Sequence, residues 1–421
     1  MMRVFYSLLL YLLTPLVLLQ LVWRGARAPA YWRRWGERFA WLPAYEAVPR
    51  IWIHAVSVGE TQAALPLVQA LRERHPGHRL LITTTTPTGS ERVRTLFGDS
   101  VDHVYLPYDL PGATRRFLAT FQPSIALIIE TELWPNLFRA CRRRDIPLLL
   151  LNARLSERSL RGYQRVAALS RSTLADISRL AAQGEADARR FLALGAAPER
   201  VRVCGNIKFD LHFPASLREQ AAVLRRDFGV ERPVWIAAST HEGEDEQVLA
   251  SFRQVRAVHA DALLVLVPRH PERFASVAAL CRREGFALVP RSAGRPCGPA
   301  TDVFLGDSMG ELPLLMAACD LVFMGGSLVP TGGHNMLEPA ALGLPVVFGP
   351  HVFNFEEISA RLLEADAARQ VRDADELAAV VCDWLADANA RHETGERGRV
   401  FVEQNRGARE CLLEVIEPCL R

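Results

Sequence analysis

Residues 302–350 read DVFLGDSMGELPLLMAACDLVFMGGSLVPTGGHNMLEPAALGLPVVFGP, and this stretch decides the fold. It contains three apolar runs, Asp302–Leu305, Leu321–Met324 and Pro345–Phe348, and each run ends in a glycine-containing turn before a helix-forming segment. Such turns direct several backbone N–H groups toward one point, which suits a phosphate. Glu338 lies in the same stretch, where its carboxylate can accept hydrogen bonds from a ribose diol. The pattern predicts a nucleotide-sugar site in the second half of the chain.

The alternation of apolar runs and helical patterns begins at Ile51 and continues through both halves of the chain. In the first half the expected strands are Ile51–Val56, Leu80–Thr84, His103–Leu106, Ile125–Ile129, Leu148–Leu151 and Val201–Val203. In the second half they are Val234–Ala238, Leu263–Val267, Leu288–Pro290, Val303–Leu305, Leu321–Met324 and Val346–Phe348. Strands that are apolar throughout and alternate with helices form parallel sheets covered on both faces. The sequence therefore predicts an α/β chain of two doubly wound Rossmann-like domains, which we expect to face each other across a cleft.

The join between the halves is expected between Phe209 and Pro233, where Pro214 interrupts the pattern. The expected boundaries are a membrane anchor at 1–24, a first domain at 25–212, a linker at 213–231 and a second domain at 232–421. The stretch from Ala374 onward has the pattern of amphipathic helices, which we expect to cross back to the first domain. The first strand-to-helix turns of the halves are also similar, because each places a carboxylate, Glu60 or Glu244, at the start of a helix.

The N-terminus carries an apolar segment, Val4–Val22, that is long enough as a helix to span roughly 28 Å of hydrocarbon. Five arginines follow it: Arg24, Arg27, Arg33, Arg34 and Arg38. By the positive-inside rule, the rest of the chain then faces the cytoplasm. A cleaved signal peptide is the less favoured alternative, because only Arg3 precedes the apolar run. An interfacial helix kinked at Pro15 is a second alternative.

The composition of the 421 residues excludes several classes of function. The net charge of +3 gives no indication of nucleic-acid binding, and the eight cysteines are scattered without a C-x-x-C motif or a Cys/His cluster. This spacing argues against a zinc site or a disulfide framework and favours a reducing compartment. The first strand is not followed by G-x-G-x-x-G, and no Walker A loop is present. Residues 302–350 contain no Asp-x-Asp pair that would suggest a metal-bound diphosphate sugar, so no metal is expected.

Three carboxylates are candidates for proton transfer or charge stabilisation. Glu60 begins the helix of residues 61–74 at a strand end, where ligands bind in such folds, although a glutamate there also favours the helix dipole. Glu130 and Glu132 follow a buried strand. We expect one of them to cap the helix after Pro135 and the other to be available to the cleft, and the sequence does not distinguish them.

The candidate cations also follow strands. Lys208 can meet the negative charge on a leaving phosphate, and Arg269 can bind a phosphate or carboxylate in a bidentate manner. Arg154 and Arg158 occupy an analogous edge of the first domain and can serve an anionic acceptor. The run Arg142–Arg144 is typical of a solvated helix face or a membrane-surface contact.

Taken in order and spacing, these segments resemble the 3-deoxy-D-manno-octulosonic acid (Kdo) transferases of Gram-negative bacteria. Besides the N-terminal apolar segment, the resemblance is carried by residues 53–60, 130–136, 152–156, 205–210, 238–244, 267–273 and 306–350. It covers nearly the whole chain and shows no departure at the positions that matter for the chemistry.

The resemblance implies a GT-B glycosyltransferase that moves Kdo from CMP-Kdo to lipid IVA with inversion, without a metal, at the cell inner membrane. It assigns Glu60 as general base and Glu130 and Lys208 as transition-state stabilisers. It implies that the CMP contacts are Pro268, Arg269, Met309, Gly310, Glu311, Asn335, Met336, Leu337 and Glu338. The first domain would then bind the acceptor and the second the donor. The alternatives are a UDP-sugar epimerase and a membrane-anchored scaffold that has lost catalysis.

Overall fold

The computed structural model describes residues 2–420 and divides the chain into two compact units. The N-terminal unit runs to Asp210 and includes the segment from Arg406, whereas the C-terminal unit runs from Leu211 to Asn405. The last segment therefore packs with the N-terminal unit, although it lies within the range 232–421 expected for the second domain. Met1, Arg421 and the side chain of Arg27 lie outside the described part of the chain.

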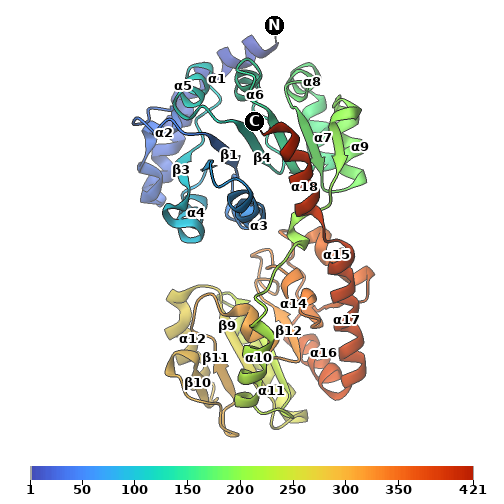
Figure 1. Ribbon diagram of the computed structural model, residues 1–421. Helices are drawn as coiled ribbons and strands as arrows, with labels where there is room; N and C mark the ends of the chain where they lie inside the picture. The colour runs from blue at the N-terminus through green and yellow to red at the C-terminus, as the bar shows by residue number, and fades with distance from the viewer. Residues whose placement is uncertain (1, 421) are drawn as a thin grey trace. The chain divides into compact units, whose positions relative to one another are not determined.

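The N-terminal unit is built on a parallel sheet of seven strands in the order β3-β2-β1-β4-β5-β6-β7 (Figure 1). The strands are β1 (Arg50–His54), β2 (Arg79–Thr84), β3 (Asp102–Tyr105), β4 (Ile125–Ile129), β5 (Leu148–Ala153), β6 (Arg179–Ala182) and β7 (Val201–Val203). The helices are α1 (Met2–Arg27), α2 (Trp35–Arg38), α3 (Val58–Arg74), α4 (Pro87–Phe97), α5 (Pro111–Phe121), α6 (Pro135–Arg142), α7 (Glu157–Gln164), α8 (Ala167–Leu174), α9 (Glu185–Leu194) and α18 (Ala408–Ile416). In the sheet, Ile53 of β1 lies between Ile82 of β2 and Leu127 of β4.

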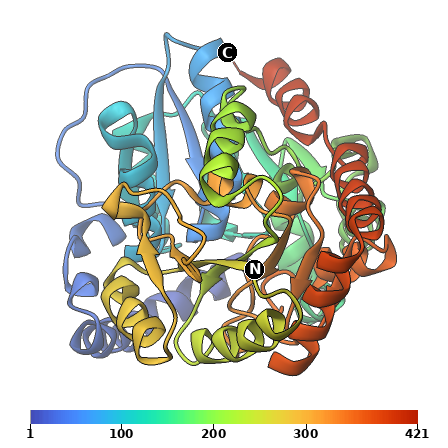
Figure 2. The ribbon, with the colours of Figure 1, turned by 90° about the horizontal axis from the view of Figure 1, so that it is seen from below.

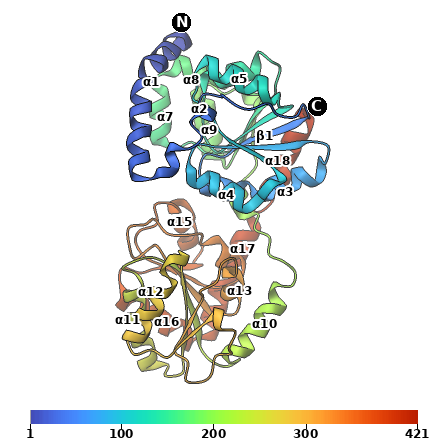
Figure 3. The same cartoon turned by 90° about the vertical axis from the view of Figure 1, so that its left-hand side faces the viewer.

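Both faces of this sheet are buried, which explains why its strands are apolar without alternation. Ile51 and Ile53 point to one face and pack in a core with Leu67 of α3 and Leu412 of α18. Trp52 points to the other face, where the core contains side chains of α5, α6 and α9. Figure 3 shows the two layers of helices on either side of the sheet. The carboxyl ends of β1, β4 and β5 are thereby held at one rigid edge.

The C-terminal unit repeats this architecture with the strand order β10-β11-β9-β8-β12-β13-β14, again parallel. Its strands are β8 (Val234–Thr240), β9 (Leu263–Pro268), β10 (Leu288–Pro290), β11 (Val303–Leu305), β12 (Leu321–Met324), β13 (Val346–Phe348) and β14 (Ala368–Gln370). Its helices are α10 (Leu217–Phe228), α11 (Asp245–Val258), α12 (Phe274–Arg283), α13 (Leu312–Ala317), α14 (Leu337–Ala341), α15 (Glu356–Glu364), α16 (Ala374–Ala386) and α17 (Ala388–Gln404). The expected pair of doubly wound α/β sheets is confirmed.

The chain returns to the N-terminal unit through α18, and the C-terminal segment can be followed in red in Figures 1 and 2. The buried Asp210 carboxylate accepts the backbone N–H groups of Gly407 (2.7 Å) and Arg409 (2.5 Å) at the start of this helix. Cys411 of α18 forms a disulfide with Cys204. This pair departs from the expectation, based on the scattered cysteine spacing, of a chain without a disulfide framework. The two residues are 207 positions apart and meet only through the crossover, so their spacing does not reveal the pair.

Within residues 2–420, α1 has the length and apolar composition needed to cross a membrane. Two of the five arginines expected to follow it at a membrane surface are instead part of the fold. Arg38 is buried, donates to the Thr85 carbonyl and lies over the Tyr105 ring. Arg34 donates to Glu37 and to the His103 carbonyl.

Candidate active site

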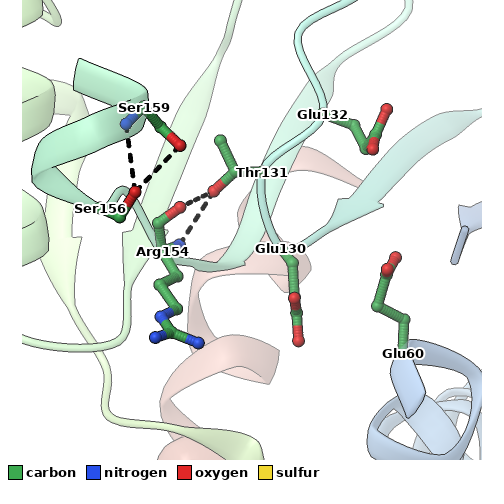
Figure 4. A pocket seen from close by; sticks show the side chains of 7 residues that line it. All are labelled: Glu60, Glu130, Thr131, Glu132, Arg154, Ser156 and Ser159. Carbon is green, nitrogen blue, oxygen red and sulfur yellow. Dashed lines mark hydrogen bonds between the residues drawn. The ribbon is translucent and has the colours of Figure 1, made fainter. Parts of the chain in front are cut away.

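The carboxyl ends of β1, β4 and β5 surround a pocket of about 340 Å³ in the N-terminal unit. We call it the acidic pocket, and it is lined by Glu60, Glu130, Thr131, Glu132, Arg154, Ser156 and Ser159 (Figure 4). Three carboxylates and one guanidinium thus share a small volume. Two of the three residues expected to be catalytic, Glu60 and Glu130, therefore line the same pocket. The third, Lys208, forms an ion pair with Glu130.

Glu60 is held by its own turn. The Ser57 hydroxyl accepts the Glu60 N–H at 3.3 Å and donates to Oε1 at 3.0 Å, while the Val56 N–H donates to Oε2 at 2.7 Å. This reciprocal arrangement at the first turn of α3 is a form of capping box, and it restricts the movement of the Glu60 carboxylate. Glu60 therefore caps the helix and also lines the pocket, so the structural and the chemical interpretation of this residue are compatible.

The electrostatics of the pocket place the titration of Glu60 near neutral pH. Burial is the main cause that raises the pKa of the Glu60 carboxyl to about 7; the nearby charges of Glu130 and Glu132 act in the same direction, and the hydrogen bonds from its turn oppose the shift. Burial also raises the pKa of Glu132 to about 7. A carboxyl whose pKa lies near the working pH can accept a proton and release it again, which is what a general base requires.

Glu130 ends β4 in a left-handed conformation with φ of 61°. Such a conformation is uncommon for a residue with a side chain and is typical of functional strand ends. Its Oε1 lies 3.2 Å from Lys208 Nζ, and both side chains are partly exposed. Lys208 is on the short 3-10 helix Ile207–Phe209, which is fixed because the Ile207 N–H donates to Asn152 Oδ1 at 3.1 Å.

The expectation that Glu130 or Glu132 caps α6 is wrong. The start of α6 is capped from another segment, since the buried Asp109 carboxylate accepts the N–H groups of Asn136 (2.9 Å) and Leu137 (2.7 Å). Both glutamates line the acidic pocket instead. Because a cap provided by a distant residue leaves no local sequence signal, the sequence pattern could not assign it.

In the C-terminal unit, the turn of residues 325–328 binds an anion that belongs to the chain itself. The fully buried Glu244 accepts the N–H groups of Gly326 (2.7 Å), Ser327 (3.0 Å), Leu328 (2.9 Å) and His241 (3.1 Å). The Gly325 N–H donates to the Ala238 carbonyl. The expectation that this glycine turn directs its N–H groups at a phosphate is therefore wrong.

Two histidines lie next to this turn and were not singled out from the sequence. His241 and His334 stack with 5.0 Å between ring centroids, and their Nε2 atoms are 2.8 Å apart. The His270 ring lies 5.5 Å from His241. Burial is the main cause that lowers the pKa of His334 to about 3, and the charges of His241 and Arg269 act in the same direction. The contact between these rings joins positions 93 residues apart, which no local motif reveals.

The expected CMP contacts follow the carboxyl ends of strands in this unit. Pro268 ends β9, and the Arg269 N–H donates to the Thr240 carbonyl. Met309, Gly310 and Glu311 follow β11, and the Glu311 carboxylate is paired with Arg291 at 2.8 Å. Asn335, Met336, Leu337 and Glu338 form the start of α14, where Asn335 Nδ2 donates to Glu338 Oε1 at 3.1 Å. No set of three metal-ligating side chains is found among residues 2–420.

Comparison with known proteins places this architecture in a family. Residues 33–211 match the profile described as 3-deoxy-D-manno-octulosonic-acid transferase (kdotransferase). The chain is 43% identical to the 3-deoxy-D-manno-octulosonic acid transferase of Haemophilus influenzae and 40% identical to that of Bordetella pertussis, covering 99% of this chain and of each relative. The UDP-GlcNAc 2-epimerase of Neisseria meningitidis bound to UDP-GlcNAc has a similar GT-B-like fold, with a TM-score of 0.57 and 14% identity over 88% of this chain and 100% of that one. The chain belongs to the 3-deoxy-D-manno-octulosonic acid transferase family.

Proposed function

We propose that this protein transfers Kdo from CMP-Kdo to lipid IVA, with inversion at the anomeric carbon, in lipopolysaccharide core biosynthesis. The observation that carries the proposal is the 43% identity to a Kdo transferase along the full length of both chains. The acidic pocket supports it, because Glu60 and Glu130 line it and Lys208 is paired with Glu130.

The reaction forms one bond and breaks another in a single displacement. The acceptor hydroxyl oxygen attacks the anomeric carbon of Kdo while Glu60 takes the hydroxyl proton, and CMP leaves with the electron pair of the broken bond. Glu130 stabilises the positive charge that develops on the sugar ring, and Lys208 stabilises the negative charge on the departing phosphate. The 3.2 Å ion pair between Glu130 and Lys208 fixes both groups before the substrates bind.

We assign donor binding to Pro268, Arg269, Met309, Gly310, Glu311 and residues Asn335 to Glu338. Arg269 offers a guanidinium to the phosphate or to the sugar carboxylate, and Glu338 accepts hydrogen bonds from the ribose diol. The turn of residues 325–328 takes no part in phosphate binding, because its N–H groups are bound to Glu244. The reaction as assigned uses no metal.

We place the enzyme at the cell inner membrane with both units on the cytoplasmic side. The acceptor is a lipid, and α1 provides the apolar surface that a lipid-bound enzyme needs. A single-pass anchor, as expected from the sequence, is one form of such attachment.

Product analysis by mass spectrometry tests the proposal. Purified protein is incubated with lipid IVA and CMP-Kdo generated in situ, and the proposal predicts an acceptor that gains the mass of one or more Kdo units. An unchanged acceptor, with CMP still raising the unfolding temperature, would indicate a cytidine-nucleotide enzyme with another acceptor. An unchanged acceptor and stabilisation by UDP instead of CMP would favour the epimerase alternative.

A further inference from the structure

The first two turns of α1 are attached to the N-terminal unit by polar contacts. Arg3 Nη2 lies 2.9 Å from Asp176 Oδ2, the Tyr6 hydroxyl donates to Asp109 Oδ2 at 3.1 Å, and the Ser7 hydroxyl donates to Asn136 Oδ1 at 3.0 Å. Figure 3 shows α1 lying lengthwise along this unit. The N-terminal end of α1 is therefore docked on the unit, although it is the end farther along the chain from the rest of that unit.

The residues that receive α1 belong to the rigid framework of the unit. Asp109, Asp176 and Asn136 are all buried. Asp109 also caps α6, and Asp176 is paired with Arg139 of α6 at 3.2 Å. Undocking α1 would remove one polar partner from each of these buried groups, which is unfavourable.

The opposite side of α1 is an apolar stripe, which we call the lipid stripe. It consists of Phe5, Leu8, Leu12, Leu16, Leu19 and Trp23, each more than half exposed. The spacing of three and four residues places them on one face of the helix. Leu21 on the inner side is 5% exposed. The polar contacts and the lipid stripe thus occupy different faces of the same helix.

A spanning arrangement would break this docking. Across a bilayer, Phe5 and Trp23 would lie at opposite interfaces, about 27 Å apart along the helix axis. Arg3 and Ser7 would then emerge on the far side, whereas Asp176 and Asn136 remain in the folded unit on the near side. The contacts of the first turns are compatible only with a helix that lies beside the unit.

We infer that α1 is an interfacial anchor, which lies in the plane of the membrane, inserts its lipid stripe into one leaflet and does not cross the bilayer. The partner is the surface of a bilayer with anionic lipids. Next to α1, α6 ends in the exposed basic run Arg142–Arg144, which is suited to lipid phosphates. The exposed Trp32 and Trp41 follow α1 along the chain, and tryptophan favours the headgroup level. The inference favours this anchor over the single-pass anchor expected from the sequence, and it does not rest on the proposed transfer reaction.

Cross-linking in native membranes tests this inference. In the variant with Ser7→Cys and Asn136→Cys, a short bifunctional thiol reagent is applied to membrane vesicles, and the peptides that carry residues 7 and 136 are identified by mass spectrometry. The expected result is the same cross-link in membranes and in detergent. A cross-link found only after detergent extraction would overturn the inference, because it would mean that α1 docks only when the bilayer is gone.

The matched control is the variant with Leu12→Cys and Asn136→Cys. Leu12 is on the lipid stripe, so the short reagent should not join it to residue 136. Equal cross-linking from positions 7 and 12 would contradict a defined docked face. Since the readout contains no transferase assay, failure of the inference and failure of the proposed function are observed separately.

A second variant covers the case in which a change at the buried Asn136 prevents folding. Arg3→Cys and Ser172→Cys replace residues whose side chains are in contact at 3.4 Å, and Ser172 is exposed. A longer bis-maleimide should join them in vesicles. In intact cells, Val4→Cys should resist a membrane-impermeant maleimide from outside, and labelling there would show that the N-terminal turn has crossed the membrane.

Discussion

The two units place the same dipeptide at the same turn and use it differently. Gly59-Glu60 follows the interior strand β1 of the N-terminal unit, and Gly243-Glu244 follows the interior strand β8 of the C-terminal unit. Glu60 accepts hydrogen bonds from its own turn and lines a pocket. Glu244 is fully buried and accepts four backbone N–H groups, three of them from the turn that follows β12.

The difference shows that the neighbouring strand decides what a carboxylate at this position does. In the C-terminal unit, the glycine turn after β12 comes close enough to enclose Glu244, so the anion inside that nest is the protein's own. In the N-terminal unit, β4 is followed by Glu130, whose negative charge cannot bind Glu60 and instead raises its pKa. One glutamate therefore stabilises the fold, and the other remains available for proton transfer.

The largest expected effect is the loss of transfer in the variant Glu60→Gln. The amide keeps the size of the side chain and cannot take a proton, so kcat should fall by about 10²- to 10⁴-fold. Stabilisation by CMP should be unchanged, because the residues proposed to bind the donor are on the other unit. The measurement is transfer to lipid IVA, with Glu73→Gln at the exposed end of α3 as the control. Normal turnover by Glu60→Gln would mean that Glu60, like Glu244, takes no part in proton transfer.

The substitution Glu244→Gln should destabilise the C-terminal unit by about 3 kcal/mol, because an amide has only one acceptor oxygen for four buried N–H groups. Chemical denaturation measures this loss. The neighbouring exposed Glu242→Gln is the matched control and should leave the free energy of unfolding unchanged. Equal stability of the two variants would mean that the turn of residues 325–328 does not need the carboxylate of Glu244.

The substitution Asp210→Asn tests a third buried carboxylate, which binds the start of α18. We expect a loss of about 1–2 kcal/mol, as for removal of a helix cap. The loss should be larger after reduction with a thiol, because the Cys204–Cys411 disulfide otherwise holds the same helix in place. Thermal unfolding with and without reductant measures both effects, and the exposed Glu199→Gln serves as the control. Identical losses in the two conditions would contradict this account of the crossover.

The smallest expected effect is that of Glu132→Gln on the pH dependence of transfer. Removing a negative neighbour lowers the pKa of Glu60, so kcat/KM should begin to rise at a lower pH than in the natural protein. The pH dependence of stability has the opposite sign to that of the transfer rate. Because the folded pKa of Glu60 lies above the unfolded value, its contribution is present at low pH and is lost as the pH rises from about 4.5 to about 7. An unchanged pH profile would show that Glu132 does not act on Glu60.

The sequence predicts the strand-forming core well and the polar contacts between distant segments poorly. Strands such as Ile125–Ile129 are apolar throughout and were expected, whereas the edge strand Ala368–Gln370 was not, because two of its three residues are exposed and polar. Glu60, Glu130 and Lys208 were named from local patterns and resemblance, and the structure brings Glu60 and Glu130 into one pocket.

What the sequence did not predict are contacts made by distant residues. The glycine turn after β12 was assigned to an external phosphate, since nothing local shows that Glu244 fills it. Asp109 replaces the expected cap of α6 for the same reason, as its position depends on the packing of a different loop. The stacked pair of His241 and His334 exists only after two strand ends have met.

The central claim is that Glu60 acts as the base in its ionised form, and that burial raises the pKa of this carboxyl to about 7. The direct test is the rate of Kdo transfer in a single turnover of the natural protein, measured from about pH 5 to about pH 8 with CMP-Kdo and lipid IVA. The account predicts that the rate rises about tenfold per pH unit at low pH and levels off above pH 7, where most of the carboxyl is ionised. A rate that is constant across this range would contradict it, because the base would then be fully ionised throughout.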